Sequence, residues 1–118
     1  MHRKVLPSFR HAFRGIRTAW ADGWNFRIHI LCAVILIFIM IYFGFSYLEW
    51  AVLLGMATIV LCGELMNTVV EKMLDIVEPG HHPLVGKIKD MAAGGVLLAS
   101  AGALAMGVFV FVHHFLTQ

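Results

Sequence analysis

The sequence predicts an all-α membrane protein with three transmembrane helices and an N-terminal amphipathic surface helix. Hydrophobic residues make up 60% of the 118 residues, charged residues only 14%, and the mean hydropathy is +0.83. A typical soluble domain carries about 25% charged residues, so this composition argues against a water-soluble monomer. The apolar residues also fall into three long runs, and most basic residues precede the first run. The length allows one domain, which we take as residues 1–118.

The first predicted element is a surface helix over residues 8–22. Arg10, Arg14 and Arg17 fall on one side of it. The apolar residues recur at intervals of three and four on the other side: Phe9, Ala12, Phe13, Ile16, Ala19 and Trp20. This is the pattern of a helix that lies in the headgroup layer. Ser8 is expected to cap the start of this helix, and Gly23 to end or kink it.

Three membrane-spanning helices are predicted at about residues 28–47, 50–76 and 87–113. The segments 30–48, 50–63 and 91–112 contain no Asp, Glu, Lys, Arg or His. A helix that crosses a bilayer needs about 20 mostly apolar residues. The spans must be helical, because hydrocarbon offers no partner for free backbone groups.

The basic residues predict the orientation of the spans. Six of the nine Lys and Arg lie in the first 27 residues, and the others are Lys72, Lys87 and Lys89. The positive-inside rule therefore places the N-terminus and the 77–87 loop in the cytoplasm. So few basic residues beside long uncharged runs fit a membrane surface better than nucleic acid, and we expect no nucleic-acid partner.

The second span carries an unusual polar stripe. Its five members are Glu64, Asn67, Thr68, Glu71 and Asp75. They lie 0, 3, 4, 7 and 11 residues after Glu64 and therefore share one helical face. A charged carboxylate deep in a membrane helix costs about 2.5–3.5 kcal/mol on insertion scales. The stripe therefore indicates a site, which we favour over plain helix packing. Lys87, Lys89 and Asp90 begin the third span on the same side and can face it.

These residue types suit the transfer of a phosphoryl group to a lipid alcohol. Carboxylates at an interface bind divalent cations, and Mg²⁺ prefers oxygen ligands beside phosphate. Nearby lysines supply positive charge for phosphate, and a deeper carboxylate can accept a proton from a lipid hydroxyl. The sequence contains neither GxxxxGK[ST] nor GxGxxG, so no ordinary nucleotide-binding loop is expected.

The chain resembles the small bacterial integral-membrane diacylglycerol kinases, a family that includes the undecaprenol kinases. The matching segments cover nearly the whole chain: Phe13–Trp20, Asn25–His29, Glu64–Glu71 with Asp75, His82–Leu84 and Lys89–Gly94. The resemblance implies a homotrimer in the bacterial cytoplasmic (inner) membrane, with composite active sites between neighbouring chains. It also implies that ATP, with Mg²⁺, phosphorylates diacylglycerol or undecaprenol directly.

The resemblance further implies a role for each matched residue. Glu64 would be the general base on the lipid hydroxyl, Asn67 would help to orient it, and Glu71 would hold the metal. By motif position, the resemblance also implies five residues that would contact or organise the nucleotide: Asp75, His82, Gly86, Lys89 and Asp90.

The sequence departs from the family pattern where the surface helix ends. Gly23 stands where the family usually has a metal-binding Glu. Either Asp22 replaces that ligand with a shorter reach, or the metal has a weaker second ligand. Lys4 is a further candidate for nucleotide contact. His29 is expected to face the interface or another chain, and His114 to lie at the surface of the outer end.

Two other functions remain as alternatives. In a small oligomeric channel or proton-coupled carrier, Glu64 and Glu71 would line a pore. The sequence disfavours this, because we find no acidic or basic residue in the outer half of a predicted span. In a non-catalytic structural subunit, Gly23 would mark a metal site that has decayed.

Overall fold

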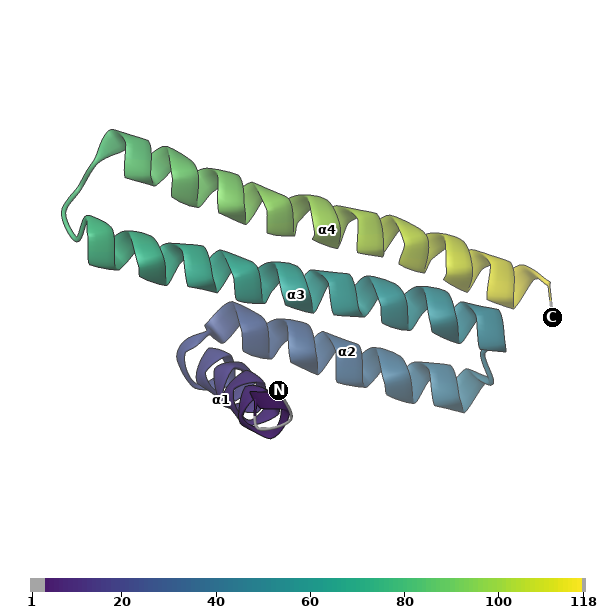
Figure 1. Ribbon diagram of the computed structural model, residues 1–118. Coiled ribbons are helices and arrows are strands. Elements are labelled where there is room, and N and C mark those ends of the chain that lie inside the picture. Colours follow the sequence, from purple (N-terminus) through teal and green to yellow (C-terminus); the bar gives the residue numbers. More distant parts are fainter. Residues whose placement is uncertain (1–3, 118) are drawn as a thin grey trace.

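The computed structural model describes residues 4–117, and this part of the chain is helical apart from short connections. The basic residue Arg3 lies outside it. The elements are α1 (Val5–Asp22), α2 (Trp24–Phe43), α3 (Tyr47–Val77) and α4 (Pro83–Leu116). In Figure 1, α2, α3 and α4 run side by side with α3 in the middle, and α1 crosses their direction beside the start of α2. The predicted all-helical class is confirmed.

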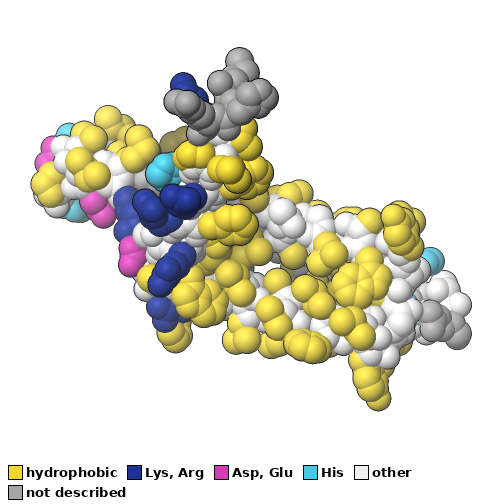
Figure 2. All heavy atoms as spheres, turned by 60° about the horizontal axis from the view of Figure 1, so that its bottom comes forward, with side chains coloured by type: hydrophobic (Ala, Val, Ile, Leu, Met, Phe, Trp, Pro, Cys, Tyr) yellow, Lys and Arg dark blue, Asp and Glu magenta, His cyan; other side chains and the backbone are white. Residues whose placement is uncertain are grey.

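The three long helices are apolar enough to cross a membrane, as predicted. Within α2, α3 and α4, an apolar 18-residue stretch has a mean hydropathy of 2.5, 1.7 and 2.3, respectively. A small apolar core joins them near one end, where Met40, Phe45 and Leu53 pack together. Most other large apolar side chains are exposed in the single chain. Figure 2 shows these side chains covering much of the surface, with the charged side chains gathered toward the α1 end.

The turn between α2 and α3 is set by two local signals. Gly44 has φ 64° and ψ 51°, a left-handed conformation that favours glycine, and the Phe45 amide donates to the Met40 carbonyl. Ser46 and Glu49 then form a capping box, in which each side chain accepts from the other residue's backbone N–H. As a result α2 ends at Phe43 rather than near 47, and α3 begins at Tyr47 rather than at 50.

The first helix begins earlier than the sequence indicated. It starts at Val5, so the Ser8 hydroxyl lies inside the first turns and donates to the Lys4 carbonyl at 2.5 Å. The prediction of Ser8 as the N-cap is therefore wrong. Pro7 does not interrupt the helix. The N–H groups of the first turn have no intrahelical acceptor, so proline, which lacks an N–H, removes no helical hydrogen bond there.

The third span forms a long hairpin with the second. His82 caps α4 by accepting the Leu84 N–H on Nδ1, and Pro83 occupies the first helical position. At 1.5 Å per residue, α3 and α4 are about 46 and 51 Å long. Both exceed the roughly 30 Å hydrocarbon thickness of a bilayer, so their polar ends can reach beyond it.

A buried polar cluster closes the hairpin at the end opposite α1. The Glu49 Oε1 atom lies 3.0 Å from His114 Nδ1, and His114 Nε2 lies 3.2 Å from the Phe43 carbonyl oxygen. The His114 ring stacks on Phe45 with centroids 4.1 Å apart, and the residue is 2% exposed. The expectation that His114 lies at the surface is therefore wrong. The His114 imidazole thus joins the end of α4 to the α2–α3 turn, because one of its nitrogens contacts Glu49 and the other contacts the Phe43 carbonyl.

We expect His114→Ala to lower the apparent melting temperature by several degrees, because it leaves Glu49 buried without its partner. His113→Ala is the matched control, since His113 is exposed beside it and should change the midpoint little. Thermal unfolding in detergent micelles measures both, and equal midpoints would show that the cluster does not stabilise the hairpin.

Candidate active site

Four of the predicted acidic residues meet in one polar hollow. This hollow has a volume of about 300 Å³ and lies where the α1–α2 junction meets α3. Its lining residues come from the end of α1, the start of α2 and the polar stripe of α3: Asp22, Gly23, Trp24, Asn25, Glu64, Thr68, Glu71, Lys72 and Asp75. The fold thus brings Asp22 to the stripe from 42 or more residues away in the sequence.

The stripe of α3 runs from a buried end to an exposed end. Glu64 and Asn67 are buried, with 5% and 8% exposure, whereas Glu71 and Asp75 are exposed. Asn67 Nδ2 donates to Glu71 Oε1 over 3.4 Å. No residue in the described part of the chain donates a hydrogen bond to the Glu64 carboxylate or to the buried Asn67 Oδ1. Among the described residues, Asn67 Oδ1 is therefore a buried acceptor without a donor, whereas the Glu64 carboxylate lines the hollow.

Arg27 fixes the junction that carries Asp22 over α3. Its Nε donates to the Trp20 carbonyl at 2.5 Å, and a terminal nitrogen donates to the Ala21 carbonyl at 2.9 Å. The guanidinium also lies over the Trp20 ring, 5.6 Å from its centroid. These carbonyls are in the last turn of α1, where helical partners are missing. Arg27 thereby folds α1 back onto the start of α2.

The same junction explains the glycine at position 23. A Cβ there would lie 2.7 Å from the Ala19 carbonyl oxygen and 3.3 Å from the Phe26 Cβ. Real Cβ atoms do not come so close to a backbone oxygen. A Glu at this position would therefore require a different junction, and Asp22 is the carboxylate that this junction brings to the hollow.

Two lysines form ion pairs with acidic residues of the hollow. Lys72 Nζ lies 3.1 Å from Asp22 Oδ2 and joins α3 to α1, and Lys89 Nζ lies 2.6 Å from Asp75 Oδ1 and joins α4 to α3. Both pairs are partly exposed, so they add little stability. They do place positive charge beside the carboxylates, as a phosphate site requires.

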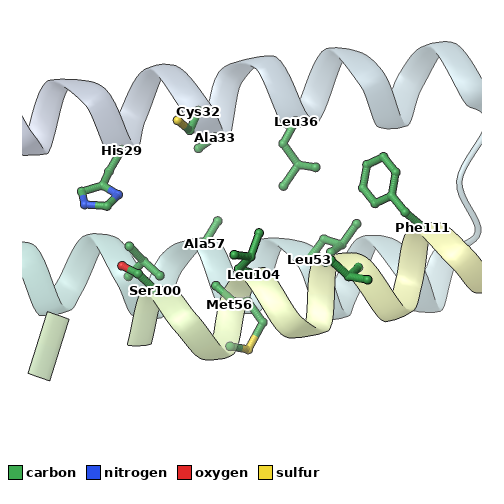
Figure 3. A pocket seen from close by; sticks show the side chains of 14 residues that line it. His29, Cys32, Ala33, Leu36, Leu53, Met56, Ala57, Ser100, Leu104 and Phe111 are labelled. Carbon is green, nitrogen blue, oxygen red and sulfur yellow. The ribbon is translucent and has the colours of Figure 1, made fainter. Parts of the chain in front are cut away.

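The buried end of the stripe borders a second hollow, which is apolar. His29 Nε2 lies 3.9 Å from Glu64 Oε2. His29 also lines a hollow of about 560 Å³ between α2, α3 and α4, whose other lining residues are mostly aliphatic or aromatic. In Figure 3 His29 lies at one end of it, and Leu36 and Phe111 lie toward the other. The His29–Glu64 pair therefore lies between the polar and the apolar hollow.

The remaining predicted site residues lie outside the polar hollow of their own chain. His82 caps α4, where its carbonyl accepts the Gly86 amide at 3.0 Å, and Asp90 is exposed next to Lys89. Lys4 precedes α1, about 27 Å along the helix from Asp22 at 1.5 Å per residue.

Lys72 was not among the predicted site residues, and His29, which was expected to face the interface or another chain, lies beside Glu64 of its own chain. Lys72 follows Glu71 directly, and its charge inside a polar stripe was a usable signal. His29 lies in an apolar span, and no residue near it in the sequence indicates a contact with Glu64.

The donor set of the hollow fits a magnesium–nucleotide complex. In the described residues, no group of three or more His, Cys, Asp or Glu side chains is arranged to hold a metal by itself. Mg²⁺ in nucleotide sites is usually held by one or two carboxylates together with substrate phosphates. Glu71 and Asp22, which line the same hollow from α3 and α1, are suited to this.

Comparison with known proteins identifies the relatives of the chain. The family of prokaryotic diacylglycerol kinases matches residues 10–111. A diacylglycerol kinase of Synechocystis is 38% identical over 87% of this chain, which spans 59% of that relative. The undecaprenol kinase of Bacillus subtilis is 30% identical over 92% of this chain and 89% of its own length. A diacylglycerol kinase of Helicobacter pylori is 31% identical over 98% of this chain and 87% of its own length.

We expect Gly23→Ala to lower the thermal midpoint by several degrees, because the added Cβ meets the Ala19 backbone oxygen. Gly15→Ala, in the middle of α1, is the control. A Cβ at Gly15 meets nothing within 4 Å, and alanine favours a helix over glycine by about 1 kcal/mol. Melting curves in micelles should show a lower midpoint for Gly23→Ala and a higher midpoint for Gly15→Ala. A neutral Gly23→Ala would show that the junction tolerates a side chain.

Proposed function

Because the chain belongs to the prokaryotic diacylglycerol kinase family, we propose that it transfers a phosphoryl group from ATP to the hydroxyl of a membrane lipid. The substrate is diacylglycerol or a polyprenol such as undecaprenol, the two lipids named for the relatives. The observation that carries the proposal is that a buried carboxylate, Glu64, lines one hollow together with three further carboxylates. The nucleotide reaches this hollow from water and the lipid from the membrane.

Glu64 serves as the general base in this proposal. Its carboxylate takes the proton as the lipid O–H bond breaks, and the lipid oxygen forms a bond to the γ-phosphorus of ATP. The bond from that phosphorus to the leaving oxygen breaks, and its electron pair leaves with ADP. Asn67 donates to Glu71 and thereby helps to hold the stripe in place. Such catalysis depends on positioning and charge rather than on a phosphoenzyme.

Glu71 and Asp22 hold Mg²⁺ in this proposal. When bound with ATP, the ion neutralises charge on the phosphates. Asp22 would be available to the ion because its pair with Lys72 is half-exposed and weak.

The nucleotide is contacted from the start of α4 and the end of α3. Lys89 and Asp75 already form a pair beside the hollow, and Asp90, His82 and Gly86 lie in the first turns of α4 or just before it. Lys4 is also assigned to the nucleotide. Its distance from the hollow of its own chain supports a contribution to a neighbouring chain.

We further propose that residues 1–118 form a single membrane domain, with the N-terminus and the active site in the cytoplasm. The basic residues near α1 support this orientation. Phe9, Phe13, Ile16 and Trp20 are all exposed along α1, which supports its placement in the headgroup layer. The membrane is then the cytoplasmic (inner) membrane of a bacterium.

A homotrimer with composite sites is the proposed assembly. Large apolar side chains remain exposed along every long helix of the single chain, and neighbouring chains can cover part of them. The stripe of small residues on α4, Gly95, Ala99, Ala103 and Gly107, allows close helix contact in lipid.

Removal of either stripe carboxylate tests the activity. We expect Glu64→Gln and Glu71→Gln to lower lipid phosphorylation by at least about 100-fold, since one loses the general base and the other a metal ligand. Radiolabelled ATP is supplied to purified protein with diacylglycerol, undecaprenol or no lipid. Glu78→Gln, at the C-cap of α3, should keep wild-type turnover. Undiminished activity in both stripe variants would refute the assigned roles.

The metal assignment of Asp22 predicts a changed magnesium requirement. We expect Asp22→Asn to raise the Mg²⁺ concentration for half-maximal rate several-fold, because one anionic ligand is lost. Lys72→Met leaves the Asp22 carboxylate unpaired and should not raise that concentration. Magnesium titrations at saturating ATP compare the two, and an unchanged titration for Asp22→Asn would exclude it as a ligand.

A further inference from the structure

We propose that His29 is a positioning residue for Glu64 and thereby sets the rate of the transfer step. This inference rests on the proposed function, since it assigns His29 a task in the same site. Its basis is the 3.9 Å separation between His29 Nε2 and Glu64 Oε2, two side chains on different helices.

The need for such a residue follows from the surroundings of Glu64. Its side chain is 7% exposed, and a carboxylate so placed in an apolar helix is costly without a polar partner. Of the Lys, Arg and His residues that the structure describes, His29 is the one whose side-chain nitrogen comes within 4.0 Å of this carboxylate. No described side chain donates a hydrogen bond to this carboxylate, so within the described part of the chain its polar contact is the one with His29.

The location of His29 connects this contact with the lipid. Glu64 lines the polar hollow, whereas His29 lines the apolar one. A lipid hydroxyl that comes from the hydrocarbon side meets the nucleotide at the border between the two. The imidazole draws the carboxylate toward α2 at this border, so Glu64 is aimed at the arriving hydroxyl. A general base that is misplaced by about 1 Å can lose 100-fold in rate.

Substitutions of His29 separate positioning from binding. We expect His29→Phe, which keeps a ring without nitrogens, to lower kcat about 10- to 100-fold, with the KM values for lipid and ATP within about twofold of wild type. His29→Gln, which keeps an N–H donor, should restore most of the loss. His113→Phe, the same change at an exposed residue near the end of α4, should have wild-type kcat. An unchanged kcat in His29→Phe, an equal loss in His29→Gln, or a rise in KM alone would each overturn the inference.

A second measurement does not depend on turnover or on a His29 variant. The ¹⁵N resonances of the His29 ring in micelles should move when Glu64 is replaced by Gln, whereas those of His113 should stay in place. Unmoved His29 resonances would overturn the contact, even if the His29→Phe chain failed to fold. If the wild-type protein phosphorylates no lipid while the His29 resonances do move, the proposed function fails and the His29–Glu64 contact stands.

Discussion

Placing a carboxylate inside an apolar membrane helix is the constraint on which the rest of this structure depends. Glu64 cannot face hydrocarbon without a large free-energy cost, so other elements must cover it. The start of α2 does so, with His29 3.9 Å from the carboxylate. The junction before α2 then brings Asp22 to the same face of α3. The buried carboxylate thus lies where surfaces of α1, α2 and α3 come together.

Two residues, Arg27 and Gly23, shape the junction between α1 and α2. Arg27 binds the last carbonyls of α1, and Gly23 lets the backbone pass close to Ala19. A side chain at position 23 would disturb that packing, and the carboxylate that reaches the hollow from this junction is Asp22. From that position Asp22 also pairs with Lys72 of α3, which joins the junction to the stripe-bearing helix.

The α3–α4 hairpin has polar contacts at both ends with different consequences. Near the hollow, Lys89 and Asp75 form a partly exposed pair, and such pairs contribute little stability. At the far end, His114 and Glu49 form a buried pair that ties α4 to the α2–α3 turn. The buried pair therefore holds its end of the hairpin more firmly than the partly exposed pair holds the other.

The sequence by itself determined the helical class, the three apolar spans and the polar face of α3, because these follow from composition and the 3.6-residue period. Helix ends were less accurate: the Ser46–Glu49 capping box was visible in the sequence, yet α3 was expected to begin at 50. Only the tertiary structure decided that Asp22 lines the same hollow as Glu71, that His29 lies beside Glu64 and that His114 is buried. These contacts join residues far apart in the chain, and their partners depend on how the helices pack, which no local pattern encodes.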